Sequence, residues 1–328
     1  MTDNAIAMAD PFSYTSAAEV EGGAIIGQTL IKLAQDRNDI VLIAPDVGRG
    51  PATMPFIEAF PERYIDTGIA EANAVSIAAG LAASGMRPVV FGIGAFLAPK
   101  CLEQIRTDVA LNLLPVTMIS CWGGLDMGYF GASHHALEDI SMLRGTPHLT
   151  IASAADDLSM QSLMQAAITD GLPTYIRGPS TFAAPVYAHA PLFTRGQMYT
   201  ISEGSDILLV GAGLGTGLCA KAAQALKDNG VSAHVLDAAY LKPFDSTGIC
   251  KAAEKARCVL VVEEHNSSAG LGALVAEALG RGSLARPFKV IGLPDDDLAV
   301  AVPHQLFERY GLTVENVASQ AIGMLSQC

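Results

Sequence analysis

Short, almost uninterrupted apolar runs alternate with helical stretches along most of this chain. Uninterrupted apolar character, rather than strict alternation of apolar and polar residues, is typical of strands covered on both faces of a parallel sheet. The pattern therefore predicts an α/β fold. The expected strands are residues 40–44, 88–93, 116–121, 149–153 and 174–177 in the first half, and 207–211, 233–239, 259–263 and 288–292 in the second.

A change in composition between residues 178 and 204 divides this pattern into two parts. The stretch has no long periodic pattern and is interrupted by prolines, which is typical of a connection between domains. We therefore expect two consecutive domains, each a mostly parallel sheet flanked by helices. Ser16 and Glu19 form a capping-box pair ahead of the first expected helix. The expected parts are a first domain over 16–185, a linker over 186–202 and a second domain over 203–328.

The overall charge restricts the kinds of partner. Among 328 residues, 20 are Lys or Arg and 33 are Asp or Glu, which gives a formal net charge of −13. An acidic surface repels phosphate backbones and anionic lipids, so we expect neither nucleic acid nor membranes as partners. Charged residues make up only 16% of the chain, which leaves room for apolar contact surface and favours an obligate oligomer.

The cysteines and the most apolar of the long uncharged runs bear on location. The run over residues 109–125 is too short and too broken by Pro and Gly to span a bilayer. The first residues contain no basic stretch ahead of an apolar one, and the six cysteines are scattered without a C-x-x-C pair. We therefore expect reduced thiols in a cytoplasmic protein.

The first candidate for chemistry is Glu71, which opens a predicted helix rich in small residues. Val75, Ala78 and Ala82 share its helical face. A carboxyl group that is sealed from water there is suited to exchange a proton with a heterocycle nitrogen. The position equally suits a carboxylate that merely complements the helix dipole, and the spacing alone favours this simpler role.

Two glycine-rich loops are further candidates. In the loop over residues 128–135, His134 and His135 could donate hydrogen bonds to a substrate or shuttle protons, or they could be solvated surface histidines. The turn over residues 211–217, with Asp237 about twenty residues later, is similar to a dinucleotide fingerprint. Thr216 stands where its third glycine should fall, so a tight turn that packs a helix on its sheet is the simpler interpretation.

Taken together, these stretches resemble one family, over about residues 16–325. Residues 60–71 resemble the pyrimidine-domain signature of transketolases and 1-deoxy-D-xylulose-5-phosphate synthases. The other matches, in the order expected for this family, are residues 87–96, 131–134 with 143–147, and 173–177, followed by 262–265 and 270–272 in the C-terminal domain.

A motif that this sequence lacks refines the resemblance. Full-length transketolases hold the diphosphate of their cofactor through a Gly-Asp-Gly motif, which occurs nowhere in this chain. The chain thus resembles the C-terminal subunit of a split, two-component transketolase. The resemblance implies thiamine diphosphate shared with an N-terminal subunit that carries the motif and Mg²⁺ or another divalent metal. It also implies a heterotetramer of two such chains and two partner chains, with no metal ligand in this chain.

The resemblance also implies roles for individual residues. Glu71 would hydrogen-bond the aminopyrimidine ring of the cofactor, Phe96 would stack on that ring, and Ile69 would contact it. His134 would contact substrate oxygens and act in catalysis. Arg177 would bind a phosphate or carboxylate end of the substrate, a task that suits its planar guanidinium, although an ion pair at an interface is the alternative.

Departures from the family pattern concern the substrate. Trp122 stands in place of a histidine, Tyr129 and Phe130 replace a Glu-Asp pair, and His135 replaces a glutamine. We therefore expect Trp122, Phe130 and His135 to line the site of a less hydroxylated substrate. The sequence leaves open the donor, the acceptor, phosphorylation of the substrate, release of carbon dioxide and the role of His265.

Three alternatives remain. The closest is the β subunit of an enzyme that decarboxylates a 2-oxo acid, such as a dehydrogenase E1 component or a deoxyxylulose phosphate synthase. The others are a nucleotide-binding module built on the turn over residues 211–217 and a scaffold without catalytic activity.

Overall fold

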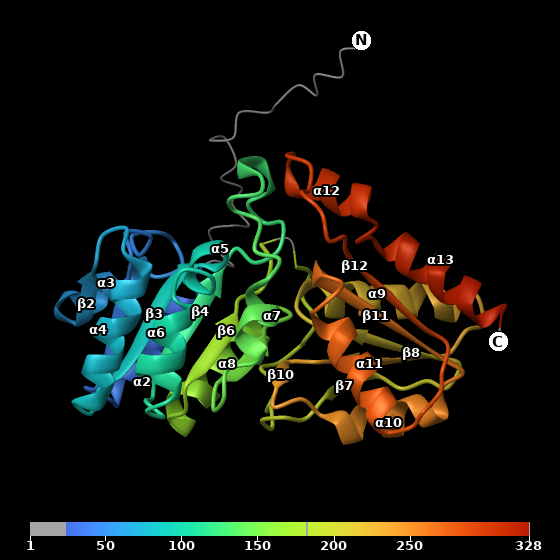
Figure 1. Cartoon of the computed structure of the whole chain (residues 1–328), viewed down its shortest axis with the longest axis horizontal. Coiled ribbons are helices and arrows are strands. Elements are labelled where there is room, and N and C mark those ends of the chain that lie inside the picture. The colour runs from blue at the N-terminus through green and yellow to red at the C-terminus, as the bar shows by residue number, and fades with distance from the viewer. Residues whose placement is uncertain (1–23, 182, 328) are drawn as a thin grey trace, which may run out of the picture.

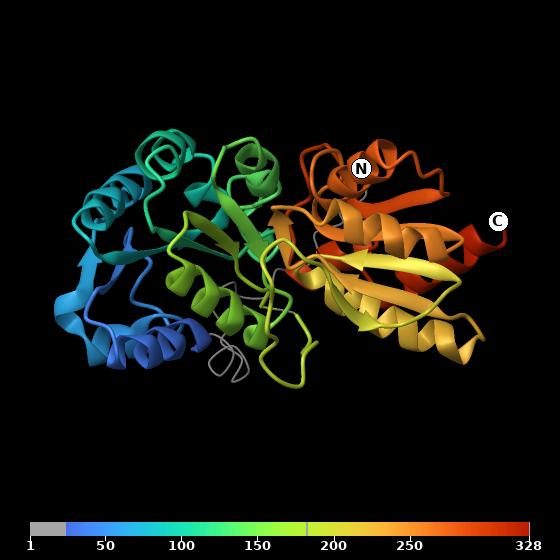
Figure 2. The ribbon, with the colours of Figure 1, turned by 90° about the horizontal axis from the view of Figure 1, so that it is seen from below.

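The computed structural model describes residues 24–181 and 183–327, so the predicted capping-box pair Ser16 and Glu19 lies outside the described residues. Two sheets, each flanked by helices, lie side by side along the long axis of the molecule (Figures 1 and 2). The predicted α/β architecture with two mostly parallel sheets is confirmed. Within the part that the structure describes, no helix is long and apolar enough to cross a membrane.

The first sheet has seven strands in the order β10-β5-β6-β4-β3-β1-β2. Strands β1 to β6 pair in parallel, and β10 is antiparallel to β5. The first six strands are β1 (Ile40–Ala44), β2 (Tyr64–Asp66), β3 (Arg87–Ile93), β4 (Thr117–Cys121), β5 (Thr150–Ser153) and β6 (Thr174–Arg177). The helical elements between them are α2 (Ile25–Gln35), α3 (Met54–Ala59), η1 (Pro61–Arg63), α4 (Glu71–Ala83), α5 (Gly94–Leu97), α6 (Leu102–Gln104), the π-helical η2 (Ile105–Ala110), η3 (Gly128–Phe130), α7 (Asp139–Arg144) and α8 (Asp157–Asp170).

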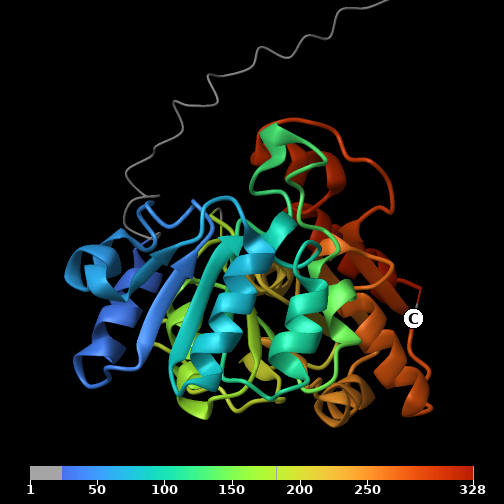
Figure 3. The same ribbon diagram turned by 60° about the vertical axis from the view of Figure 1, so that its left-hand side comes forward.

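Helices cover both faces of this sheet, as the apolar runs predict. Leu42 of β1 packs into a cluster with the residues of α2, α3 and α8, whereas its neighbour Ile43 packs into a second cluster with those of α4 and α7. Figure 3 brings α4, in cyan, to the front of the sheet. Because neighbouring residues of a strand point to opposite faces, a strand buried on both faces contains an unbroken apolar run.

The second sheet has five strands in the order β12-β11-β8-β9-β7. All its pairs are parallel except that of the edge strand β7 with β9. Its strands are β7 (Tyr199–Ser202), β8 (Ile207–Gly211), β9 (Ala233–Asp237), β11 (Cys258–Asn266) and β12 (Phe288–Leu293). Its helices are α9 (Leu214–Asp228), α10 (Ser246–Lys255), α11 (Leu271–Arg281), α12 (Pro303–Tyr310) and α13 (Val314–Leu325).

Every predicted strand forms, with ends that shift by at most a few residues, whereas three short strands were not expected. These are β2, β7 and β10 (Tyr240–Lys242), which have three or four residues each. Strand β7 lies inside the segment 186–202 that the sequence predicts as a linker, so the end of that segment belongs to the second sheet. Strand β7 lacks the unbroken apolar run that predicts a buried strand, because it is a partly exposed edge strand.

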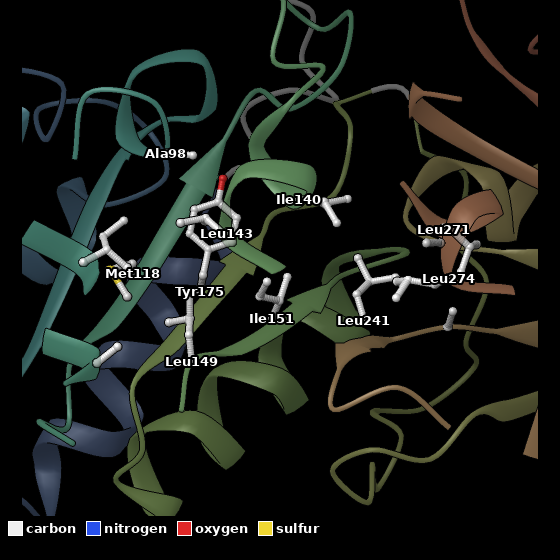
Figure 4. Packing of buried hydrophobic residues seen from close by; sticks show 14 of the residues in the cluster. Ala98, Met118, Ile140, Leu143, Leu149, Ile151, Tyr175, Leu241, Leu271 and Leu274 are labelled. Atoms are coloured by element: carbon white, nitrogen blue, oxygen red, sulfur yellow. The ribbon is translucent and has the colours of Figure 1, made fainter. Parts of the chain in front are cut away.

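Strand β10 also crosses the expected division between the domains. It follows β9 in sequence but pairs with β5 of the first sheet, where Tyr240 lies opposite Ala152. A continuous apolar cluster accompanies this crossing, from Tyr175 and Ile151 in the first sheet through Leu241 to Leu271 on α11 (Figure 4). The two sheets therefore share one buried core, which fixes the second domain against the loops of the first.

Candidate functional site

The predicted site residues lie where strands of the first sheet end. Glu71 follows β2, Phe96 follows β3 and Trp122 follows β4, while Arg177 is the last residue of β6. The carboxyl ends of parallel strands meet at one edge of a sheet, which is where open α/β sheets bind ligands. The topology thus gathers residues that are far apart in the sequence at a single edge.

Glu71 is the first residue of α4, and its side chain is almost covered. The residue is 7% exposed, and the predicted helical face is confirmed, because Val75, Ala78 and Ala82 are buried behind it. The free N–H groups at a helix N-terminus stabilise a negative charge. The helix thus presents a nearly buried carboxylate at the edge of the sheet.

Lys100 pairs with this carboxylate, a contact that we did not expect from the sequence. Its Nζ lies 3.3 and 3.4 Å from the two carboxylate oxygens of Glu71 and 4.2 Å from the centroid of the Phe96 ring. The backbone N–H of Lys100 donates to the carbonyl oxygen of Phe96, so the two residues are one helical turn apart. That spacing of four residues from Phe96 is the signal that could have identified Lys100.

Aromatic rings continue the site beyond Phe96. The rings of Phe96 and His134 meet in a T-shaped arrangement with centroids 5.0 Å apart, and Phe130 stacks on His134 at 4.6 Å. Burial, and then the positive charge of Lys100, lower the pKa of His134, which keeps the imidazole neutral at neutral pH. The structure thus brings Glu71 and Phe96 together at one ammonium group, with His134 against Phe96 and Phe130 stacked on His134.

The remaining residues proposed for the cofactor or substrate make other contacts or none that reach this group. Ile69 is 78% exposed in the loop before α4. His135 is buried, and its Nε2 lies 3.4 Å from the carbonyl oxygen of Gly128. The ring of Trp122 meets Phe91 edge-on at 6.3 Å, and its backbone φ is +53°, which bulky residues rarely adopt. Trp122 is therefore held in an unusual conformation directly after β4.

Arg177 is at the same sheet edge, but buried groups of the protein surround it. The residue is 5% exposed, its Nε lies 3.3 Å from Oδ2 of Asp139, and its Nη2 donates to the carbonyl oxygens of Ala136 and Glu264. With these contacts, the guanidinium faces buried groups of the protein and not solvent. They match the alternative interpretation, an ion pair at an interface, more closely than a subsite for a substrate anion.

The loop that carries His134 rests on the second domain. The carboxylate of Glu264, in β11, accepts a hydrogen bond of 2.7 Å from the backbone N–H of Leu125. Gly124 has a φ of +62°, and a side chain there would collide with the same carboxylate. Figures 1 and 3 show this loop, in green, beside α12, where Leu306 lies directly against Gly128.

Further buried ionisable groups occupy this junction. Burial raises the pKa of Asp126 and of Glu264 above their usual range. His265 is fully buried, with its Nε2 3.7 Å from Oδ1 of Asp139. Glu263 accepts hydrogen bonds of 2.6 and 2.9 Å from the first two backbone N–H groups of α11. In this structure His265 and Glu263 therefore contact neighbouring elements of the fold.

The glycine-rich turn before α9 is a packing device. Asp237 is fully buried and accepts hydrogen bonds from Thr216 at 2.8 Å and from Tyr187 at 2.6 Å, so its carboxylate is not available to a ribose. A side chain at Gly215 would overlap the carbonyl oxygen of Val262. The turn thus lets α9 approach the sheet closely, as the simpler interpretation predicts.

Comparison with known proteins identifies both halves of the chain. Residues 18–182 match the model of the transketolase pyrimidine binding domain, and residues 196–317 match that of the transketolase C-terminal domain. The chain is 34% identical over 296 residues to one of the subunits of the apulose-4-phosphate transketolase of Phocaeicola vulgatus, covering 90% of this chain and 94% of that protein.

Other similar proteins are longer. The chain is 33% identical over 323 residues to the 1-deoxy-D-xylulose-5-phosphate synthase of Desulfotalea psychrophila, covering 97% of this chain and 48% of the synthase. It therefore spans about half the length of such synthases.

Solved structures of transketolases are also similar to this chain. A split gene transketolase, described as an inactive beta4 tetramer, superimposes with a TM-score of 0.82 at 31% identity, covering 92% of this chain and 97% of that one. A transketolase mutant from Pichia stipitis shares the fold, with a TM-score of 0.77 at 19% identity over 93% of this chain and 45% of its own.

Proposed function

Because this chain belongs to the transketolase family, we propose that it is the C-terminal subunit of a two-component, thiamine diphosphate-dependent transketolase. Such an enzyme transfers a two-carbon ketol or acyl unit from a ketone donor to an aldehyde acceptor. The observation that carries the proposal is the placement of Glu71, Phe96 and His134 at one sheet edge, in a chain that spans 94% of a split transketolase subunit.

The residues at this edge fit an aminopyrimidine. Glu71 offers a nearly buried carboxyl group to a ring nitrogen, and Phe96 offers an aromatic face on which a flat ring can stack. Ile69 lies close to Glu71 in sequence and would contact the same ring. When bound, thiamine diphosphate supplies a nucleophilic carbon that carries the transferred fragment. Glu71 would hold and exchange the proton of the ring nitrogen, which needs a carboxyl group shielded from water.

The substrate would lie on the His134 side. A neutral imidazole can both donate and accept a hydrogen bond, so His134 suits a substrate carbonyl or hydroxyl oxygen. Phe130 is 48% exposed beside His134. Its aromatic side chain therefore stands where an acidic residue would otherwise bind hydroxyl groups. We infer a less hydroxylated substrate, with Trp122 and His135 on the same side. Full activity on xylulose 5-phosphate would contradict this inference.

The partner would be an N-terminal transketolase subunit in the cytoplasm. It would carry the Gly-Asp-Gly motif and hold the diphosphate with Mg²⁺ or another divalent metal. Two such chains and two partner chains would form a heterotetramer. The exposed side of α4, which carries the small residues Ser76, Gly80 and Ala83, and the low charge of the chain are suited to a large apolar contact between unlike subunits.

Co-expression with a chain that carries the Gly-Asp-Gly motif tests the proposal. The purified pair should bind thiamine diphosphate and turn over, whereas this chain alone should do neither. Glu71→Gln should assemble normally but lose at least about 100-fold in turnover, because its proton exchange is removed. Glu103→Gln, a change of the same kind at an exposed residue, is the matched control. Turnover by the lone chain, or an active Glu71→Gln pair, would refute the proposal.

A second candidate is supported by the matches to deoxyxylulose phosphate synthases, which are as similar to this chain as the transketolase subunit is. In that case the pair would decarboxylate a 2-oxo acid before transferring the acyl unit. Release of carbon dioxide from pyruvate by the purified pair distinguishes the two candidates.

A further inference from the structure

One ammonium group engages both side chains that we propose for the cofactor ring. The Nζ of Lys100 is within 3.4 Å of both carboxylate oxygens of Glu71 and 4.2 Å from the centroid of Phe96. We propose that Lys100 holds the place of the aminopyrimidine in the cofactor-free chain and must leave it for the cofactor to bind. This inference rests on the proposed function.

The two occupants exclude each other on geometric grounds. A ring that stacks on Phe96 has its centroid about 4.5–7 Å from the Phe96 centroid, and its atoms fill the space directly above that face. The ammonium already lies 4.2 Å above the same ring. A ring nitrogen that hydrogen-bonds Glu71 must also come within about 3 Å of an oxygen that now faces Nζ. Both contacts of the cofactor ring therefore require the position of the Lys100 head group.

The lysine also explains how the empty site stays formed. Glu71 is almost covered, and a buried carboxylate without a partner is unfavourable. In the described part of the chain, Lys100 supplies the ion pair to this carboxylate. The same charge reaches His134, whose pKa it helps to lower. Lys100 thus stabilises the arrangement of the site until a ligand replaces it.

Displacement of Lys100 should be inexpensive. Its side chain is 49% exposed, so the ammonium can move into water without crossing a packed core. Ion pairs and cation–π contacts at such exposed positions are weak. Lys100 would therefore act as a positioning residue that competes modestly with the cofactor rather than blocking it.

The test measures cofactor affinity rather than turnover. Thiamine diphosphate with Mg²⁺ is titrated into the complete complex by calorimetry. In parallel, ¹⁹F NMR follows a fluorotryptophan at Trp122, the one tryptophan of this chain. Lys100→Ala should tighten the Kd by about 5- to 30-fold, because both weak contacts no longer compete. Lys100→Arg, which can still pair with Glu71, should bind like the wild type, as should the exposed control Lys251→Ala.

The outcomes separate the two proposals. An unchanged or weaker Kd for Lys100→Ala, while the wild-type complex binds the cofactor, would overturn the role of Lys100 and leave the proposed function intact. A Lys100→Arg variant that binds as tightly as Lys100→Ala would also overturn it, since the charge would then be irrelevant. If the wild-type complex fails to bind the cofactor, the proposed function falls and this inference with it.

Discussion

Replacing Arg177 with methionine distinguishes a structural role from a role in binding substrate. Methionine keeps much of the length of the side chain but removes the guanidinium that contacts Asp139 and the carbonyl oxygens of Ala136 and Glu264. If Arg177 mainly joins the two domains, this change destabilises the fold. If it mainly binds a substrate anion, the change raises KM and leaves the fold intact.

The magnitude follows from burial. Burial lowers the pKa of Arg177, but the carboxylates around it, with Asp139 first among them, outweigh that effect and raise it. Removing one partner of a buried ion pair costs about 3–5 kcal/mol, because the other charge remains buried without compensation. Among the described residues, Asp139 would keep its hydrogen bond from Tyr175 and a long contact to His265. We therefore expect Arg177→Met to lose about 3–5 kcal/mol in the free energy of unfolding.

Urea unfolding at a fixed protein concentration measures this loss, since oligomer stability depends on concentration. Arg281→Met is the control, because Arg281 is largely exposed and its ion pair with Glu277 is worth at most about 1 kcal/mol. A variant as stable as this control, with a raised KM in the assembled enzyme, would refute the structural role and restore Arg177 as a substrate ligand.

Two further predictions concern the second domain. Gly215→Ala should destabilise the chain by about 1–3 kcal/mol in urea unfolding, because its side chain would overlap the carbonyl oxygen of Val262. Gly280 has open space around it, so Gly280→Ala should be neutral or stabilising. Equal effects of the two changes would contradict the packing argument. Burial raises the pKa of Asp237 to about 6 in the folded chain. As pH rises, the unfolded chain therefore releases this proton before the folded chain does. The free energy of unfolding should fall by about 3 kcal/mol between about pH 4 and 6. Asp237→Asn should lack this part of the pH dependence, and a wild-type slope in that variant would show that Asp237 does not titrate as the structure indicates.

The strands were predictable where burial was complete. Strands β1 and β8, for example, are buried along their whole length and have the predicted bounds, because a strand covered on both faces needs an unbroken apolar run. Strand β10 was not predictable, since three residues carry no periodicity and its pairing with β5 depends on how the domains meet. Pairing between strands of different domains depends on tertiary packing, which a local sequence pattern cannot predict.

The site was predictable to a similar degree. The sequence placed Glu71 at a helix start with small residues behind it, and the structure buries that face. The assignment of Phe96 and His134 came from a family resemblance, and the structure shows their rings in contact. Lys100 was missed because its importance depends on Glu71, which is 29 positions away in the sequence. The burial of Arg177 was equally hidden, because its partners come from a loop and from the other domain.

The support of the His134 loop has a consequence for specificity. Glu264 holds the start of this loop, and Leu306 and Val300 lie directly against its backbone at Gly128 and Gly131. All three residues belong to the second domain, which shares a buried apolar core with the first. The position of Phe130 in this loop therefore depends on residues that are more than 120 positions away in the sequence. A change in the segment before α12 should alter substrate preference without touching any residue that we propose to contact the substrate.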